Sequence, residues 1–288
     1  MSPQMNSQKF VKLSDDFFAD ADYAQAFRKL GMTCLDKVFD FNAGQNLDKP
    51  NLAKHRTRVK FDLDEPNVTL FLKRYDRPPK LTQIKNWLHH HRRASTSSFD
   101  RSAGKELAAA GIGTPQTIAY GEQWARGFEK CSFIITQKIP RAESLERKLP
   151  DFFHKEPSAQ NLKQRREFIE RLADFTKQFH KTGFRHCDLY LSHIFLSGRE
   201  NFYLIDLQRV FKPILLGRRF RVKDVSQLYY SAPAKYFSLA DRLRFYLRYT
   251  GRKKLIPADK RFIRKVNAAA GRIARHDIRH GRGVGFAI

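Results

Sequence analysis

The segment Phe184–Leu196, FRHCDLYLSHIFL, places groups that bind protons and metals between apolar residues. His186 precedes Asp188 by two positions, and His193 follows it by five. An ionisable group inside a protein costs free energy unless a partner pairs it or a reaction uses it. The segment therefore predicts a polar loop with a chemical function, for which the rest of the chain supplies candidate partners.

Length and composition predict a folded protein with a large core. The chain has 288 residues, 41% of them hydrophobic, which suits one large domain or two lobes. No apolar run approaches the ~18 residues of a membrane span, and the N-terminal stretch lacks the apolar region of a signal peptide. Cys34, Cys131 and Cys187 lack metal-ligand spacing and predict reduced thiols. We therefore expect a cytoplasmic protein.

The charge predicts an anionic partner. Lys and Arg total 55 against 29 Asp and Glu, a formal net charge of +26. Residues 251–288 alone hold eleven Lys or Arg and two Asp. Nucleic acid, an acidic membrane surface and a phosphorylated substrate all suit such an excess, and a solvated basic surface is the alternative for any single run. The sequence lacks the aromatic signatures of RNA-binding modules, which disfavours nucleic acid.

The first half of the chain predicts mainly strands. Residues 14–30 predict a capped helix, with Ser14 at the N-cap and Gly31 after its end. Residues 98–111 predict a second helix that stops at a glycine. Alternating or β-rich apolar runs predict strands at 33–41, 55–63, 68–75, 116–122 and 131–139.

The second half predicts mainly helices. Residues 161–183 form a strong amphipathic pattern that ends at a glycine. Residues 201–210 predict a short strand, and the chain from about Lys223 onward predicts basic helices. The polar segment at 184–196 therefore lies where a β-rich half gives way to a helical half.

Two aspartates and one lysine are the candidates for chemistry. Asp206, in LIDL, lies at the end of a short strand, eighteen positions after Asp188. Two such carboxylates suit a proton acceptor and a Mg²⁺ ligand. Lys73 lies in an apolar strand beside Phe71 and Leu72, where an ammonium group requires an anionic partner. A phosphate or a helix glutamate is the usual partner.

The order of these motifs resembles that of kinases. Lys73 in TLFLKRY, Glu106 in AGKELAAAGIGTP, HCDLYLSH and LIDLQRV follow the order of the strand lysine, helix glutamate, catalytic loop and metal-binding loop. Over about residues 33–250 the chain resembles the protein-kinase-like superfamily. The forms HxDLYxxH and IDLxR resemble within it the lipopolysaccharide kinase family of bacteria, the Kdo and inner-core heptose kinases.

This resemblance implies a two-lobed α+β fold with a small antiparallel β-rich N-lobe and a larger, mainly helical C-lobe. The corresponding segments are an N-terminal helical extension at 1–32, an N-lobe at 33–139, and a C-lobe at 140–288 with a basic helical C-terminus.

The resemblance also implies ATP and Mg²⁺ and assigns roles within the C-lobe. Asp188 resembles the catalytic base, and Asp206 resembles the metal-binding aspartate. His193 stands where kinases usually have a metal-binding Asn, with a structural histidine as the alternative. Asp224 resembles the buried aspartate that holds the catalytic loop, and His186 is expected to be architectural.

For the nucleotide, the resemblance implies that Lys73 pairs with the phosphates and that Glu106 steadies it. Gly44 occupies the turn that covers the phosphates, although it is almost alone there. The hinge from Gln137 to Ile139 offers backbone groups to adenine, and Glu143 contacts the ribose.

Several positions depart from the pattern of protein kinases. Cys187 replaces an arginine, which argues against control by activation-loop phosphorylation. Tyr190 stands in place of a phosphate-steering lysine, so that another basic residue would have to serve. The triplet His89–His91 has no further ligand at metal spacing, and we prefer a solvated basic segment there.

The function implied is phosphoryl transfer from ATP to an alcohol group of a sugar, heptose first and Kdo second, in the lipopolysaccharide inner core. The substrate would be an anionic glycolipid at the cytoplasmic face of the inner membrane, with the enzyme bound peripherally to that acidic surface. Basic clusters at Arg218–Lys223 and Arg252–Lys254 are candidates for this contact. The alternatives are a kinase of the same fold for a small molecule or protein, and a catalytically silent binding protein for anionic membrane or nucleic acid.

Overall fold

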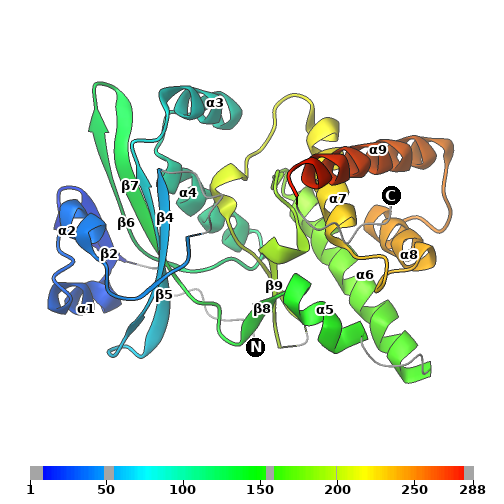
Figure 1. Cartoon of the computed structure of the whole chain (residues 1–288), viewed down its shortest axis with the longest axis horizontal. Coiled ribbons are helices and arrows are strands. Elements are labelled where there is room, and N and C mark those ends of the chain that lie inside the picture. Colours follow the sequence, from blue (N-terminus) through cyan, green and yellow to red (C-terminus); the bar gives the residue numbers. More distant parts are fainter. Residues whose placement is uncertain (1–8, 49–54, 154–158, 199, 282–288) are drawn as a thin grey trace. The chain divides into compact units, whose positions relative to one another are not determined.

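The computed structural model describes residues 9–48, 55–153, 159–198 and 200–281, which divide into two compact units (Figure 1). The first, here called the sheet unit, contains residues up to Lys105 and residues 115–139. The second, the helical unit, contains residues 106–114 and those from Pro140 onward. A largely antiparallel sheet in one unit and mostly helices in the other confirm the predicted α+β class.

The described residues of the sheet unit form an antiparallel sheet of seven strands in the order β1-β2-β6-β7-β5-β4-β3. The strands predicted at 55–63 and 68–75 are confirmed, and they are neighbours in the sheet, with Lys73 of β5 opposite Arg58 of β4 and Ile134 of β7. The bounds are β1 Phe10–Ser14, β2 Phe17–Asp20, β3 Gln45–Asn46, β4 Arg56–Leu63, β5 Val68–Asp76, β6 Thr117–Ala125 and β7 Phe128–Gln137.

The helix expected at 14–30 is mostly wrong. Residues 10–20 form the hairpin β1–β2, and only Ala24–Lys29 (α1) is α-helical after a short 3₁₀ turn, η1 (Ala21–Tyr23). Ser14 does not cap a helix, because its hydroxyl donates to the Asp16 carboxylate at 2.6 Å within the hairpin turn. Pairing of β2 with β6 buries Phe17, which overrides the local helix signal. Gly31 does end the helix, in a left-handed conformation.

The strand expected at 33–41 is also wrong, since Leu35–Asp40 form a short helix, α2. Six residues are too few for a helix to be stable alone, and distant side chains cap both of its ends. Asp16 accepts a hydrogen bond from the Leu35 amide at 3.3 Å, and the Arg74 guanidinium donates to the carbonyl oxygens of Val38, Phe39 and Phe41. Figure 1 shows α1 and α2 packed on one face of the sheet, where their apolar residues join its core.

Two further helices follow β5. The first is α3 (Lys80–His90), and the second is α4 (Thr96–Ala109), which confirms the helix expected at 98–111. The histidine triplet lies at the end of α3. His90 stacks on Phe99 with ring centroids 3.9 Å apart, and His91 ends the helix with φ +50°.

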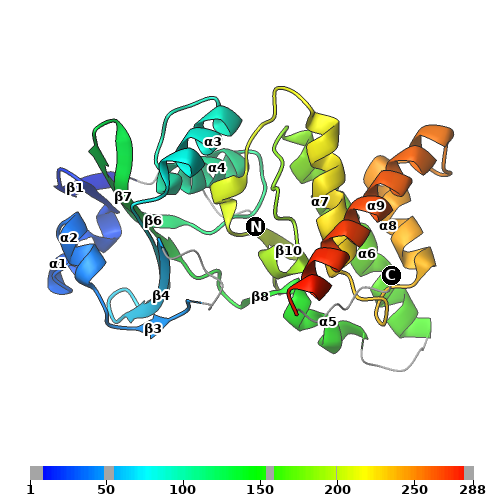
Figure 2. The same cartoon turned by 45° about the horizontal axis from the view of Figure 1, so that its top comes forward.

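The helical unit carries five helices in its described part, together with a small sheet of strands in the order β10-β9-β8 (Figure 2). Phe168 and Phe179 of α6 are buried, as its amphipathic pattern predicts. α9 packs on α7 and α8 packs on α6, around a core that includes Tyr246 and Phe262. The bounds are α5 Leu145–Phe153, α6 Ala159–Lys181, α7 Gly217–Ser231, α8 Leu239–Thr250, α9 Pro257–Arg279, β8 Ala142–Ser144, β9 Ile194–Ser197 and β10 Asn201–Leu204.

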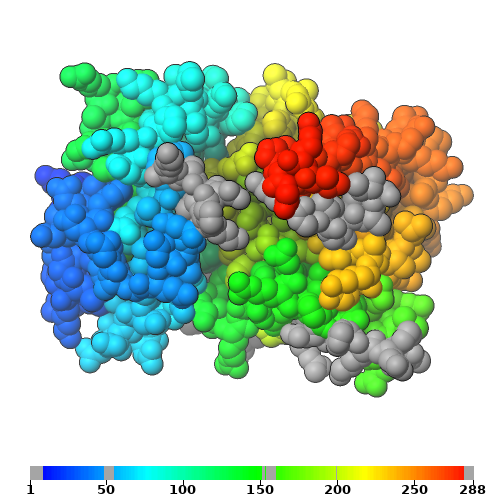
Figure 3. Space-filling model, in the orientation of Figure 1, coloured from blue at the N-terminus to red at the C-terminus, as the bar shows by residue number. Residues whose placement is uncertain are grey.

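α9 lies on the surface of the helical unit (Figure 3). Phe262, Val266, Ala270 and Ala274 recur at helical spacing on its buried side, and the basic residues between them are largely exposed. The last seven residues of the basic C-terminal stretch, 282–288, lie outside the described residues. None of the helices in the described part of the chain combines the length and the apolar character needed to cross a bilayer.

Candidate active site

The polar loop after α6 is held by side chains of α7. The buried Asp224 carboxylate accepts hydrogen bonds from the amides of His186 at 2.9 Å and Cys187 at 2.7 Å. The Gln227 side chain accepts from the Leu189 amide and donates to the Cys187 carbonyl. The backbone polar groups of this buried loop are thus satisfied by α7, which agrees with the expectation for Asp224.

These bonds hold a backbone that is unfavourable by itself. Cys187 has φ +65°, a left-handed conformation that costs a residue with a side chain about 1 kcal/mol. Its amide and carbonyl are both bonded to α7, which offsets that cost. Burial raises the pKa of the Cys187 thiol to about 12, so the thiol is neutral and inert. The left-handed turn directs the chain into Asp188, the predicted base.

Asp188 is paired with a residue that the sequence analysis did not assign. Its Oδ2 accepts a hydrogen bond from Nη1 of Arg209 at 2.7 Å, and both side chains are partly exposed. Arg209 ends the 3₁₀ turn η3 (Leu207–Arg209) and lies three positions after Asp206. The signal was present, because this arginine is the last residue of the IDLxR pattern.

His193 and Asp206 meet in the same part of the helical unit. Nδ1 of His193 lies 2.7 Å from the Asp188 carbonyl oxygen, which can only accept, so this nitrogen carries the proton. In the neutral ring Nε2 therefore has a lone pair, and it lies 4.0 Å from Oδ2 of Asp206. That separation is too long for a hydrogen bond. The two side chains thus face each other across a gap.

His186 joins the catalytic loop to the segment that carries Asp206. Its Nε2 donates to the carbonyl oxygen of Ile205, the residue before Asp206, at 3.0 Å. The ring is fully buried and stacked near that of His193. Burial lowers the pKa of His186, so the ring is neutral near pH 7. These contacts are structural, as expected for this histidine.

The residues present fit a magnesium ion. Mg²⁺ usually takes one or two carboxylates and completes its shell with phosphate oxygens and water. Asp206 would supply the carboxylate, and the side chain of His193 faces it, although nitrogen is a less favoured ligand for Mg²⁺ than oxygen. The described residues contain no group of three or more His, Cys, Asp or Glu side chains able to hold a metal. Asp206 and His193 would thus need phosphate oxygens and water to complete the shell.

In the sheet unit, Lys73 is paired with Asp100 and not with Glu106. Its Nζ lies 2.8 Å from Oδ2 of Asp100, and both side chains are largely buried. Glu106 instead accepts from Lys212 at 2.8 Å, and both of those side chains are about half exposed. The expectation that Glu106 steadies Lys73 is therefore wrong.

Helix geometry explains this correction. Six residues separate the two acids on α4, which turns the second about 120° away from the first. Asp100 lies on the same face as the buried Ala103 and Leu107, whereas Glu106 is exposed. The position of Asp100 on the apolar face of the expected helix was the signal that could have identified it.

The remaining nucleotide candidates lie at element ends. Gly44 precedes β3 with φ +116°, and a Cβ there would lie 2.5 Å from the Lys60 carbonyl oxygen, so only glycine fits. The amides of Gln137 and Lys138 donate to the carbonyl oxygens of Gln116 and Thr69. Of the three hinge residues, Ile139 is the one whose amide is not used in these two bonds. Glu143 lies in β8, opposite Leu196 of β9. Contacts of these residues with a nucleotide remain predictions.

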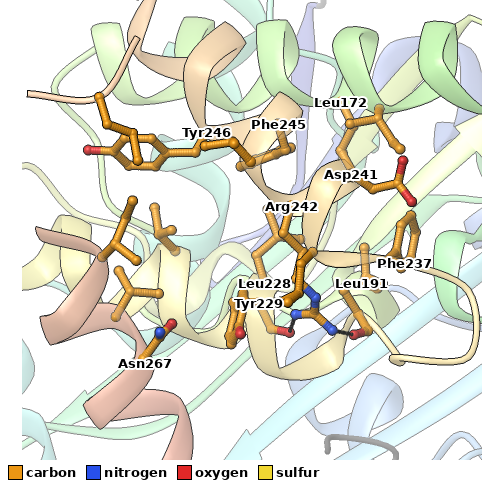
Figure 4. Close-up of a pocket in the computed structure, with 18 residues that line it drawn as sticks. Leu172, Leu191, Leu228, Tyr229, Phe237, Asp241, Arg242, Phe245, Tyr246 and Asn267 are labelled. Atoms are coloured by element: carbon orange, nitrogen blue, oxygen red, sulfur yellow. Dashed lines mark hydrogen bonds between the residues drawn. The ribbon is translucent and has the colours of Figure 1, made fainter. Parts of the chain in front are cut away.

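A separate apolar cavity of about 300 Å³ lies among the helices of the helical unit (Figure 4). Leu172, Leu228 and Phe245 are among its apolar lining. Its two charged residues are already bonded. Asp241 pairs with Arg165 and Ser238, and Arg242 donates to backbone carbonyls at the end of α7. The cavity therefore presents an almost wholly apolar wall.

Comparison with known proteins gives consistent relatives. The family model described as "Lipopolysaccharide kinase (Kdo/WaaP) family" matches residues 52–249. The lipopolysaccharide core heptose(I) kinase WaaP of Escherichia coli (strain K12) is 27% identical over 235 residues, covering 78% of this chain and 87% of the relative. The protein of the same name from Pseudomonas aeruginosa is 30% identical over 148 residues, covering 49% of this chain and 54% of the relative.

A solved structure, "WaaP in complex with acyl carrier protein", matches with a TM-score of 0.65 and 21% identity, covering 85% of this chain and 95% of that one. At that identity the likeness establishes the fold. It confirms the predicted two-lobed, kinase-like α+β architecture.

Proposed function

The chain belongs to the lipopolysaccharide kinase (Kdo/WaaP) family and is a phosphotransferase that acts on a sugar hydroxyl; from this premise we propose that the sugar is a heptose of the lipopolysaccharide inner core, with Kdo as the second choice. The phosphoryl donor is ATP, and the reaction takes place at the cytoplasmic face of the inner membrane. The supporting observation is the cluster of Asp188, Arg209, His193 and Asp206 on a loop held by α7.

Within this proposal, Asp188 accepts the proton of the attacking hydroxyl. One carboxylate oxygen is held by Arg209, and we assign the other oxygen to the acceptor. General base catalysis of this kind contributes typically 10²–10⁴-fold. Arg209 fixes the carboxylate and places a positive charge beside it. It is therefore our candidate for the basic residue that replaces the lysine expected at Tyr190.

For the donor, we assign Lys73 to the phosphates, with Asp100 holding the ammonium group in place. Asp206, joined by His193, would hold Mg²⁺, which neutralises charge on the β- and γ-phosphates when it is bound. Gly44, Gln137, Ile139 and Glu143 keep their proposed roles around the nucleotide. Most of the rate enhancement then comes from positioning and charge neutralisation, because phosphoryl transfer has a loose transition state.

We also propose peripheral attachment to the acidic inner membrane. Ile214, Leu215 and Leu216 are consecutive apolar residues that are 72%, 77% and 61% exposed. Exposed Arg218 and Arg219 follow them directly. Apolar side chains that enter the interface beside basic residues are typical of monotopic attachment, and each basic residue near an anionic surface adds about 1 kcal/mol. The formal net charge of +26 also favours binding to an acidic membrane surface.

An acyl carrier protein is a further proposed partner. The related solved structure names such a complex, and the apolar cavity of about 300 Å³ in this chain suits an acyl chain. Replacing Leu228, which lines that cavity, with Trp should prevent co-purification with the acylated carrier and leave the thermal midpoint within a few degrees. Equal co-purification of the wild type and the Leu228→Trp variant would remove the cavity from this interaction.

The acceptor assignment is tested with purified enzyme, Mg²⁺ and labelled ATP, on lipopolysaccharide from a strain that lacks the gene. Mass spectrometry should show one additional phosphate, and fragmentation should place it on a heptose. A phosphate on Kdo would replace the first choice by the second. Labelling of protein or small metabolites, with none on lipopolysaccharide, would contradict the proposal and favour the rival kinase.

A further inference from the structure

A second cavity in the helical unit, of about 490 Å³, is strongly basic. It lies where α6 and α8 end and where α7 and α9 begin. Asp259 is its only acidic lining residue among those the structure describes. Its basic lining residues are Lys177, Lys181, Arg185, Arg218, Arg221 and Arg252.

Tertiary packing joins two basic clusters that are distant in sequence. Arg218 and Arg221 belong to the first turns of α7, whereas Arg252 follows the end of α8. Lys177 belongs to α6, and its Nζ lies close to Gly251 at the end of α8, since a Cβ added to Gly251 would lie 2.9 Å from it. The sequence presents the clusters at 218–223 and 252–254 as separate candidates for an anionic contact. In the fold they share one cavity.

Among the described lining residues of this cavity, the positive charges outnumber the negative ones. Asp259 already accepts hydrogen bonds from the Tyr246 hydroxyl at 2.9 Å and the Ile256 amide at 3.0 Å, and it pairs with Arg252 at 3.3 Å. One engaged carboxylate thus faces six cationic side chains. Like charges brought together without a counter-charge repel one another. Such a cavity favours an anionic occupant.

Arg185 and His180 form part of the wall of this cavity. Arg185 donates through Nη1 to the His180 carbonyl, whereas its buried Nε has no hydrogen-bond partner among the described residues. Burial lowers the pKa of Arg185. Burial also lowers the pKa of His180, although its contact with the Asp224 carboxylate acts in the opposite direction. A buried donor without a partner is costly, and an anion in the cavity would offset that cost.

We propose that this cavity is an anion-binding site that takes a group carrying two phosphates, supplied by a phosphorylated lipid headgroup or by the anionic part of the acceptor glycolipid. Each phosphomonoester carries about −1.5 to −2 at pH 7, so two of them offset about three to four of the six cations. Arginine and lysine are the residues that recognise phosphate by charge-assisted hydrogen bonds. The site is separate from the reaction centre, because Asp188, His193 and Asp206 do not line it. The glycolipid source rests on the proposed function, whereas phosphate binding does not.

Binding of an anion in the cavity should affect the catalytic loop. His180 lines the cavity, and its Nδ1 lies 2.8 Å from the Tyr249 hydroxyl, which also lines it. The other ring nitrogen of His180 lies 3.1 Å from Oδ2 of Asp224, the carboxylate that holds the amides of His186 and Cys187. An anion that orders this wall should therefore slow hydrogen exchange at those two amides.

The test compares two triple variants of equal charge. Lys177→Gln, Lys181→Gln and Arg221→Gln alter the cavity, whereas Arg261→Gln, Arg264→Gln and Lys265→Gln alter exposed positions of α9 outside it. Titration with inorganic pyrophosphate at fixed ionic strength should show binding at least about tenfold weaker in the cavity variant, and near wild type in the control. Pyrophosphate should also slow exchange at the loop amides in wild type and control. Equal affinity in both triple variants would overturn the proposal.

Two further measurements separate the possible sources. A lipid headgroup predicts that the cavity variant binds vesicles containing diacylglycerol pyrophosphate less well than the control, with an unchanged KM for deacylated acceptor. The acceptor source predicts a raised KM and unchanged vesicle binding. If the cavity variant does not fold, the single change Arg221→Gln at an exposed position serves instead, and pyrophosphate affinity equal to the wild type in that variant would overturn the proposal. Because pyrophosphate binding needs no turnover, failure here is distinguishable from failure of the kinase assignment.

Discussion

Two polar clusters of the helical unit use charge in opposite ways. Around the catalytic loop, Asp224 holds backbone amides, Asp188 is paired with Arg209, and Asp206 faces His193. In the basic cavity, six cations face one carboxylate that is already bonded. Where charges are balanced within the protein, the cluster fixes the geometry of its own side chains. Where positive charges are in excess, as in the cavity, the cluster favours an anionic ligand.

His180 connects these clusters. One of its ring nitrogens contacts Tyr249 in the wall of the cavity, and the other contacts Asp224 under the catalytic loop. Substitutions in the catalytic-loop cluster and in the cavity should therefore have different effects. Changes in the compensated cluster should reduce stability or turnover without any added ligand, whereas changes in the cavity should matter when an anion is present.

The largest effect is expected at Asp224. Asp224→Ala leaves two buried amides and one ring nitrogen without their acceptor, and it should lower the free energy of unfolding by about 3 kcal/mol. Chemical denaturation measures this change. The matched control is Asp174→Ala, an exposed carboxylate paired with Arg248, which should cost no more than about 1 kcal/mol. Similar losses in both variants would show that the loop network is not specially stabilising.

The next largest effect, on turnover, distinguishes the proton-accepting carboxylate of Asp188 from Arg209, which positions it. Asp188→Asn should lower kcat by at least ~10²-fold with little change in ATP affinity, because the amide cannot accept the proton. Arg209→Gln, which loses the charge but keeps a donor, should lower kcat by about tenfold. Steady-state kinetics and nucleotide titration measure both. A wild-type rate in the Asp188 variant would remove that residue from the mechanism.

A smaller effect distinguishes the two acids of α4. Asp100→Asn should raise the KM for ATP by about tenfold, because Lys73 loses a buried ionic partner. Glu106→Gln removes only an exposed pair with Lys212, and it should change KM by less than about twofold. The reverse order of these effects would restore Glu106 as the functional partner of Lys73.

The smallest effect concerns pH. Burial lowers the folded-state pKa of both His180 and His186, so the unfolded chain binds more protons than the folded chain once the pH falls below about 6.5. The free energy of unfolding should therefore decrease as the pH falls from 7 to 5, by at most about 1.4 kcal/mol per pH unit for each histidine. His186→Asn should show a shallower decrease. A stability that rises on acidification over this range would contradict the assignment of neutral rings.

Much of the helical unit could be predicted from sequence. The loop motif at 184–196, the apolar period of α6 and the strand before Asp206 depend on residues that are close together in the chain, so local patterns carry them. The same locality made it possible to name Asp188 and Asp206 before their contacts were known, and the family resemblance added Asp224. Arg209 was visible in the same motif, but its contact with Asp188 depends on how the turn η3 folds back.

Other features were decided only by tertiary contacts. α2 is helical because Asp16 and Arg74, distant in sequence, cap its two ends, and β1 and β2 are strands because β6 pairs with β2. The partner of Lys73 depended on which face of α4 meets the sheet. The basic cavity exists because four helix ends converge, which no local pattern records. Sequence alone therefore determined the chemistry that lies within single segments. The fold determined which charges meet, since electrostatic and capping interactions act through space between residues that are far apart in the chain.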